Sequence, residues 1–276
     1  MEICKICNNL HITNEFDLFD EFQMNTFLKR IFDGIVTPTR LDFDVYQRIA
    51  RKLTNGVEEG FGTEIIRTQW GSPDYNMLTA LRENVYVFSA ARQHQMNVEV
   101  SALLTTETGL KPWSQFREEA AQVFERYNRR YLAVEYNQAV LQARAASQWM
   151  EIEKDQDIYD QLRYETVGDG RVRPQHRVLD GVIRPINDRF WTQYYPPNGW
   201  SCRCTVVQTT GERNTRLDRL VTNVLPDISE TDVPKIFRFN SGKKKMIFNT
   251  NHPYFKVEKQ YKQLALRNFD MELPKK

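Results

Sequence analysis

The chain has 276 residues, 41% hydrophobic and 27% charged, which is the composition of a globular protein long enough to bury a substantial core. Its net charge of +2 is small, although residues 151–276 carry 22 Lys and Arg against 17 Asp and Glu. This excess tolerates a nearby polyanion but is well short of the basic stripe of a dedicated DNA-binding protein. No apolar run approaches the ~20 residues that span a bilayer, and the N-terminus lacks the pattern of a secretion signal. We expect a protein made in a cytoplasm, without a membrane partner.

The first 110 residues follow helical periodicity. Apolar residues recur at steps of three and four over residues 15–32, from Thr39 to about Asn55, and from about Asp74 towards Leu104. Between the second and third of these helices, residues 60–74 contain three glycines and a proline, which predicts a loop around a short element.

The longest predicted helix follows Pro112. No Gly or Pro appears from there until Gly168, and aromatic and aliphatic residues keep helical spacing. The pattern predicts a helix of about 35 to 40 residues, well above the average for globular proteins. It is either continuous or broken near Asn128–Arg130. We interpret the aromatic stripes of these helices as core packing rather than ligand sites.

Shorter elements fill the second half. We predict a strand over 162–167, a helical turn between Pro174 and Gly181, a polar loop over 184–191 and a strand at Val206–Val207. A short helix near 217–224, a hairpin with strands 236–239 and 246–248, and a helix over 257–266 follow. The order predicts an α+β fold with a helical region 1–110, a long helix or helix pair 111–153, and a smaller mixed domain 154–276.

Turn-forming and reactive residues concentrate in residues 167–207. Pro196, Pro197, Asn198 and Gly199 cannot extend a helix or a strand, so the chain turns sharply just before Cys202-Arg203-Cys204. On an extended segment two cysteines two residues apart project to one face, where a direct disulfide would be strained. They are suited to form half of a tetrahedral structural zinc site.

His176 is the nearest plausible third ligand. The fourth could be Asp180, which shares a helical face with His176, or His252, a water molecule, or the Cys4 and Cys7 pair. The alternative is that Cys202 and Cys204 are small buried hydrophobic residues and that the imidazole bonds a loop backbone.

An aromatic cluster lies beside this turn. Its members are either an exposed patch for a protein partner or the core under the turn. They are Phe190, Trp191, Tyr194 and Trp200.

The motifs of this stretch resemble those of the phage Mu F-like minor head proteins, a head-morphogenesis family of tailed bacteriophages and prophages. The family's G-D-x-R-x-R-P-x-H-x-x-L-x-G, D-x-x-W and P-P-N-G-W-x-C-R-C fall on residues 168–181, 188–191 and 196–204. A helix over 131–149, F-x-x-N-x-G at 237–242 and H-P-Y-F at 252–255 extend the similarity to roughly residues 125–256. Ordered motifs over such a length are far more specific than a single short one.

The resemblance implies a minor capsid component that associates with the portal vertex during head assembly and stays in the virion, inside the phage head. The implied partners are the portal protein, capsid or scaffold proteins and, non-specifically, packaged DNA. The resemblance does not imply catalysis. From the residues alone, the alternative is a metal-dependent nuclease or phosphodiesterase in which His176, Asp180 and Asp188 act on nucleic acid and Arg173 or Arg203 holds the phosphate.

Overall fold

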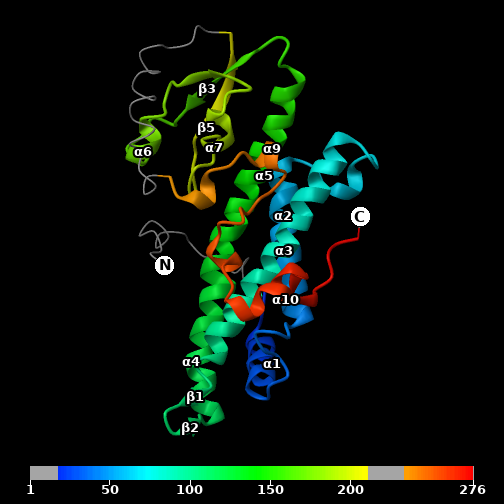
Figure 1. The fold of residues 1–276 in the computed structure, drawn as a ribbon, viewed down its shortest axis with the longest axis vertical. Coiled ribbons are helices and arrows are strands. Elements are labelled where there is room, and N and C mark those ends of the chain that lie inside the picture. Colours follow the sequence, from blue (N-terminus) through cyan, green and yellow to red (C-terminus); the bar gives the residue numbers. More distant parts are fainter. Residues whose placement is uncertain (1–17, 211–232, 276) are drawn as a thin grey trace. The chain divides into compact units, whose positions relative to one another are not determined.

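The computed structural model describes residues 18–210 and 233–275 (Figure 1). They form two compact units, each assembled from separate stretches of the chain. The first unit comprises the described parts of Met1–Asn55, Arg82–Asn137 and His252–Lys276, and the second comprises those of Gly56–Leu81 and Gln138–Asn251. The predicted α+β class is confirmed, because a helix-rich first half precedes short antiparallel strands. The domain boundaries drawn from the sequence stay a prediction.

Helices account for most of the first half. They are α1 (Glu21–Phe32), α2 (Phe43–Phe61), the short 3-10 helix η3 (Ile65–Arg67) and α3 (Pro73–Ser101), and a small hairpin of β1 (Thr105–Thr106) and β2 (Gly109–Leu110) follows. A capping box starts α1, since the Asp20 carboxylate accepts the Gln23 N–H at 2.8 Å and the Gln23 side chain accepts the Asp20 N–H at 3.1 Å. The helices predicted in this half are confirmed, with residues 15–17 outside the described part.

The long predicted helix forms as α4 (Trp113–Glu125), the π-helical segment η4 (Arg126–Tyr131) and α5 (Leu132–Lys154). The break predicted near Asn128–Arg130 is therefore a π-bulge, in which the Leu132 N–H donates to the Tyr127 carbonyl five residues back. No helix in the described residues is both long and apolar enough to cross a membrane.

The second unit contains a three-stranded antiparallel sheet in the order β4-β3-β5. Its strands are β3 (Gln161–Glu165), β4 (Ile183–Pro185) and β5 (Thr205–Thr209), and Leu162 pairs with Arg184 on one side and Gln208 on the other. Two short helices, α6 (Pro174–Arg177) and α7 (Phe190–Gln193), lie in the connections. The strands predicted near 162–167 and 206–207 are confirmed. The polar loop predicted over 184–191 is confined to residues 186–189, because β4 includes its first two residues and α7 its last two.

One face of this sheet packs into a core that also takes residues from α5. Leu162 and Tyr164 point inward from β3, and Trp149 comes from α5. The Tyr195 hydroxyl donates to the Ala145 carbonyl of α5 at 3.0 Å, which ties the segment after α7 to that helix.

The hairpin predicted over 236–248 is wrong. This segment forms the 3-10 helix η5 (Lys235–Phe237) and the short helix α9 (Ser241–Lys244), which the Asn240 side chain caps by accepting the Lys243 N–H at 3.0 Å. The last predicted helix is confirmed from Lys259 onward. Its neighbourhood contains η6 (Pro253–Phe255), η7 (Lys259–Tyr261), α10 (Lys262–Leu266) and η8 (Asn268–Asp270). The helix predicted over 217–224 and the Cys4 and Cys7 pair lie outside the described residues.

Candidate metal centre

Three side chains with metal-binding atoms meet in the second unit. His176, Cys202 and Cys204 place those atoms within 4.8 Å of one another. The His176 Nδ1 lies 3.6 Å from the Cys202 Sγ and 3.7 Å from the Cys204 Sγ. His176 and Cys202 are buried, Cys204 is half-buried, and both cysteines are free thiols.

The first loop of the site is the helical turn that carries His176. Pro174 occupies the first turn of α6, where its missing N–H costs no helical hydrogen bond. Gly181 then reverses the chain at a φ of 75°, a conformation that favours glycine. The Arg173 Nη2, just ahead of the helix, donates to the Trp200 carbonyl at 2.7 Å and so fastens this turn to the cysteine-bearing loop.

The second loop is the buried turn Pro196 to Gly199, whose Pro196-Pro197 peptide bond is cis. Asn198 is fully buried, and its Oδ1 accepts the Tyr164 hydroxyl at 3.0 Å. A Cβ on Gly199 would lie 3.2 Å from the Arg173 Nη1, so glycine permits the close approach to α6. The positive φ of this region falls on Ser201, at 52°.

The third loop begins at Gly168 and is clamped to the Cys-x-Cys segment by an ion pair. Both Asp169 carboxylate oxygens accept from the Arg203 guanidinium, each at 2.8 Å. These bonds hold the pKa of Asp169 down at about 2. The bidentate geometry fixes the orientation of the segment between the two cysteines, although the pair is too exposed to add much stability.

Asp180 does not join the three-residue group. Its Oδ1 instead accepts the Thr166 N–H at 2.7 Å and the Thr166 hydroxyl at 2.9 Å, which ties the end of the helical turn to β3. Asp188 has a comparable structural contact, because its Oδ1 accepts the Phe190 N–H at 2.8 Å and starts α7. His252 also lies outside the group, and its Nδ1 accepts the Tyr254 N–H.

The pKa values of the two thiols shift in opposite directions. The hydrogen bond from Cys204, followed by the contact with His176, lowers the pKa of Cys202 despite its burial. The same thiol-to-thiol bond and burial raise the pKa of Cys204. The arrangement therefore stabilises a thiolate beside an imidazole nitrogen.

The aromatic residues near the turn are core rather than an exposed patch. Phe190, Trp191 and Tyr194 are buried, and Trp200 is half-buried against Phe237 with ring centroids 5.1 Å apart. The reading of these residues as a partner surface is corrected by their burial.

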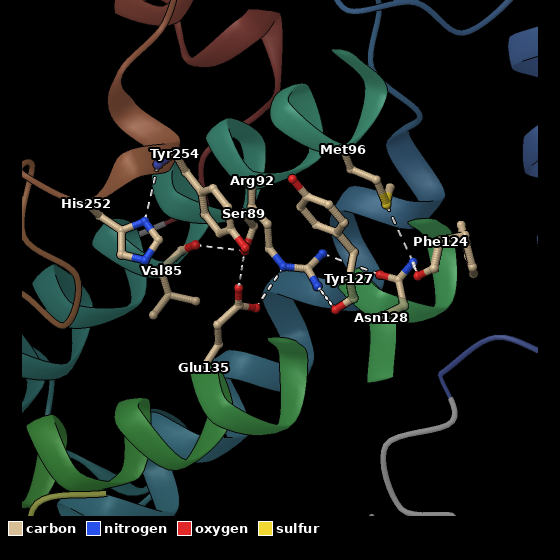
Figure 2. Close-up of polar contacts among 10 residues, drawn as sticks. All are labelled: Val85, Ser89, Arg92, Met96, Phe124, Tyr127, Asn128, Glu135, His252 and Tyr254. Carbon is tan, nitrogen blue, oxygen red and sulfur yellow. Dashed lines mark hydrogen bonds and ion pairs between the residues drawn. The ribbon is translucent and has the colours of Figure 1, made fainter. Parts of the chain in front are cut away.

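Sequence reasoning missed a buried polar network in the first unit, which Figure 2 shows. The Arg92 Nε donates to the Glu135 Oε2 at 2.7 Å, and the Tyr254 hydroxyl donates to the other oxygen at 3.0 Å. Arg92 also donates to the Tyr127 carbonyl and, at 3.3 Å, to the Asn128 Oδ1.

The motifs and loops described above coincide with a family match. The model of the family described as "Phage Mu protein F like protein" matches residues 47–207, more than half of the chain. The chain belongs to this family. The motif similarity starts near residue 125, whereas the family match begins at residue 47 and so includes much of the helical first half. The match ends at residue 207, before the motifs at 237–242 and 252–255.

Two curated relatives of this Mu F-like chain are phage or prophage proteins. It is 38% identical over 84 residues to "Putative capsid assembly protein F" of Escherichia phage Mu, covering 30% of this chain and 19% of that protein. It is 48% identical over 44 residues to the "Mu-like prophage FluMu F protein" of Haemophilus influenzae, covering 16% of this chain and 11% of that protein. The aligned segments thus span less than a fifth of either relative. No solved structure matches the chain.

Proposed function

We propose that this Mu F-like chain is a minor head protein of a tailed phage or prophage, which associates with the portal vertex during head assembly and is retained in the virion. The observation that carries the proposal is the family match over residues 47–207, together with the naming of the phage Mu relative as a capsid assembly protein. We assign it an assembly role rather than a catalytic one.

The described side chains near the centre support a non-catalytic role. Asp180 and Asp188, the carboxylates that a nuclease would use, each accept backbone N–H groups at loop ends. Arg173 and Arg203, the residues suited to hold a phosphate, bond the Trp200 carbonyl and the Asp169 carboxylate. These residues serve to hold loops together.

The proposed partners are the portal protein, capsid or scaffold proteins and, non-specifically, packaged DNA. The modest positive charge of residues 151–276 is compatible with crowding beside DNA. Binding of this kind is electrostatic, so we expect any DNA affinity to be weak and to fall steeply as salt concentration rises.

The test is an in-frame deletion of the gene in a phage or prophage that encodes the chain, with complementation from a plasmid. We expect the deletion to reduce the yield of infectious particles and complementation to restore it. Quantitative mass spectrometry of purified wild-type heads should find the chain in far fewer copies than the major capsid protein, and crosslinking should join it to the portal protein. A chain absent from heads and from assembly intermediates would contradict the proposal.

A nuclease assay addresses the alternative. Purified protein is incubated with plasmid DNA and with Mg²⁺, Mn²⁺ or Zn²⁺, beside a His176→Ala variant. We expect neither protein to cleave the DNA. Cleavage by the wild type that the variant lacks would identify an enzyme instead.

A further inference from the structure

We infer that the second unit binds one zinc ion through the His176 Nδ1, the Cys202 Sγ and the Cys204 Sγ, with the fourth coordination position taken by water. This inference concerns the ion and its ligands, and it does not depend on the proposed role in head assembly.

The two distances between the imidazole nitrogen and the sulfur atoms fit a tetrahedral ion. With zinc bonds of ~2.3 Å to sulfur and ~2.0–2.1 Å to nitrogen, a tetrahedral angle separates the sulfur and nitrogen atoms by ~3.6 Å. The Nδ1 of His176 lies 3.6 and 3.7 Å from the two sulfur atoms. The nitrogen is therefore at the right distance to share one ion with each sulfur, and all three atoms lie within 4.8 Å of one another.

The chemical types of the three ligand atoms favour zinc over calcium and magnesium. Two thiolates and an imidazole form a soft to borderline donor set that suits zinc, whereas calcium and magnesium require oxygen ligands. A bound divalent ion would ionise both thiols.

A small hollow beside the ligands has room for a water molecule. His176, Cys202 and Cys204 line a hollow of about 20 Å³, and one water needs ~10–15 Å³ on this measure. The other lining residues include no carboxylate that could act as a general base: Val167, Arg171, Val172, Arg173, Ser201 and Arg203. The missing base favours a structural ion over a catalytic one.

The ion would join segments that are far apart in the sequence. His176 belongs to α6, and the two cysteines lie between the buried turn and β5. The Arg173 and Arg203 bonds described above already hold these loops close, so the ligands are organised before an ion arrives. Loss of the ion would loosen the loops and lower the thermal stability of the protein.

The test measures zinc in the full chain by elemental analysis after purification under reducing conditions. A Cys202→Ser, Cys204→Ser variant is compared with a Cys4→Ser, Cys7→Ser variant, which removes the same number of thiols. We expect about one zinc per chain in the wild type and in the Cys4/Cys7 variant, and close to none in the Cys202/Cys204 variant. Removal of zinc from the wild type by a chelator should lower its Tm.

Three results would overturn the inference. Wild-type protein without zinc, after expression with added zinc, would exclude the ion. Zinc retained by the Cys202/Cys204 variant would exclude these ligands, and zinc lost from the Cys4/Cys7 variant would show that the N-terminal pair supplies the remaining ligands. Removal of zinc with no change in Tm would exclude the structural role.

A second measurement covers the case in which the Cys202/Cys204 variant does not fold. Alkylation of wild-type thiols is followed by mass spectrometry with and without the chelator. We expect Cys202 and Cys204 to react slowly until zinc is removed, because metal-bound thiolates are poorly available to the reagent. Equal rates with and without the chelator would contradict zinc binding.

Discussion

Arg92 places a full positive charge inside the helical unit, where its side chain has no exposed surface. Burial raises the pKa of Glu135, its ionic partner, while the Arg92 guanidinium opposes that shift. The π-bulge of η4 supplies further acceptors, because the Tyr127 carbonyl and the Asn128 side chain both bond Arg92 (Figure 2). Every strongly polar atom of this guanidinium and carboxylate pair thus meets a specific partner.

We predict that Arg92→Met destabilises the protein by about 3–5 kcal/mol, since it leaves the Glu135 carboxylate buried without its counter-charge. The measurement is urea unfolding near pH 7. A Glu135→Gln substitution added to Arg92→Met should recover part of the loss, because it removes the unpaired charge and keeps an acceptor for Tyr254. If the double variant lost as much stability as the sum of the losses from Arg92→Met and from Glu135→Gln alone, this account would be contradicted.

His252 is a second buried titratable residue of the same unit, packed against Phe88 with ring centroids 5.0 Å apart. Burial lowers the pKa of His252 from 6.5 to about 4. The unfolded chain therefore binds more protons between these two pH values, and this residue's contribution to stability is lost as the pH falls from 6.5 through 4. Above pH 6.5 both states hold a neutral imidazole and the contribution is constant.

We predict that protonation of His252 costs the wild type about 2–3 kcal/mol between pH 7.5 and pH 4.5, in addition to the titration of carboxylates. His252→Asn keeps a side-chain acceptor for the Tyr254 N–H and removes the titration. Urea unfolding of both proteins at several pH values should therefore give a shallower pH dependence for the variant. Parallel curves for the two proteins would assign the acid sensitivity to other groups.

At the scale of elements, the short helix α9 depends on a glycine. A Cβ on Gly242 would lie 2.4–2.7 Å from three atoms of the Trp149 side chain, which is itself fully buried on α5. Four residues cannot form a stable helix by themselves, so α9 is held by its Asn240 cap and by this contact with α5.

We predict that Gly242→Ala destabilises the protein by about 1–3 kcal/mol, because the added methyl group must displace the tryptophan or the helix. Gly170→Ala is the matched control, since a Cβ there meets no atom within 4 Å. Thermal unfolding followed by circular dichroism should show a lower Tm for the first variant and little change for the second. An unchanged Tm for Gly242→Ala would mean that the contact is easily relieved.

The sequence predicted correctly the elements whose conformation follows from their own local residue pattern. Long runs of helical spacing gave α1, α2 and α3. The π-bulge between α4 and α5 includes Asn128–Arg130, where the sequence allowed a break in an otherwise continuous helix. The same is true of the candidate centre, because a tight turn before Cys202 and a helical turn bearing His176 are local properties.

The predictions that differ from the structure concern segments whose conformation depends on contacts with distant parts of the chain. The alternation Ile236-Phe237-Arg238-Phe239 resembles a strand, but Phe237 is buried against Trp200 in η5 instead of pairing with a second strand. Arg184 made β4 look like a polar loop, yet its backbone pairs with β3 and its side chain is buried. Asp180 satisfies the spacing rule for a ligand, whereas its carboxylate is engaged by Thr166.

At the scale of the whole molecule, the core of the second unit reaches beyond the domain that the sequence suggested. Ala145, Trp149 and Ile152 of α5 belong to the same core cluster as the sheet, although they precede residue 154. Removal of a buried tryptophan alone costs ~3–5 kcal/mol, and a typical domain is stable by only ~5–15 kcal/mol.

We therefore predict that a fragment of residues 154–251 lacks fixed tertiary structure, while one of residues 138–251 retains more of it. Near-ultraviolet circular dichroism and the sharpness of thermal unfolding distinguish the two cases. Equal signals from both fragments would show that α5 is dispensable for this core and would support a boundary at residue 154.

The interleaving of the chain between the two units has a consequence for its synthesis on the ribosome. The first unit takes its helices from residues made early, but one hydrogen-bond donor to the buried Glu135 is Tyr254, which is made late. Until that residue leaves the exit tunnel, the carboxylate lacks one of its two partners. The helical unit therefore completes its fold only after Tyr254 has left the exit tunnel, and until then its newly made helices form an unfinished intermediate.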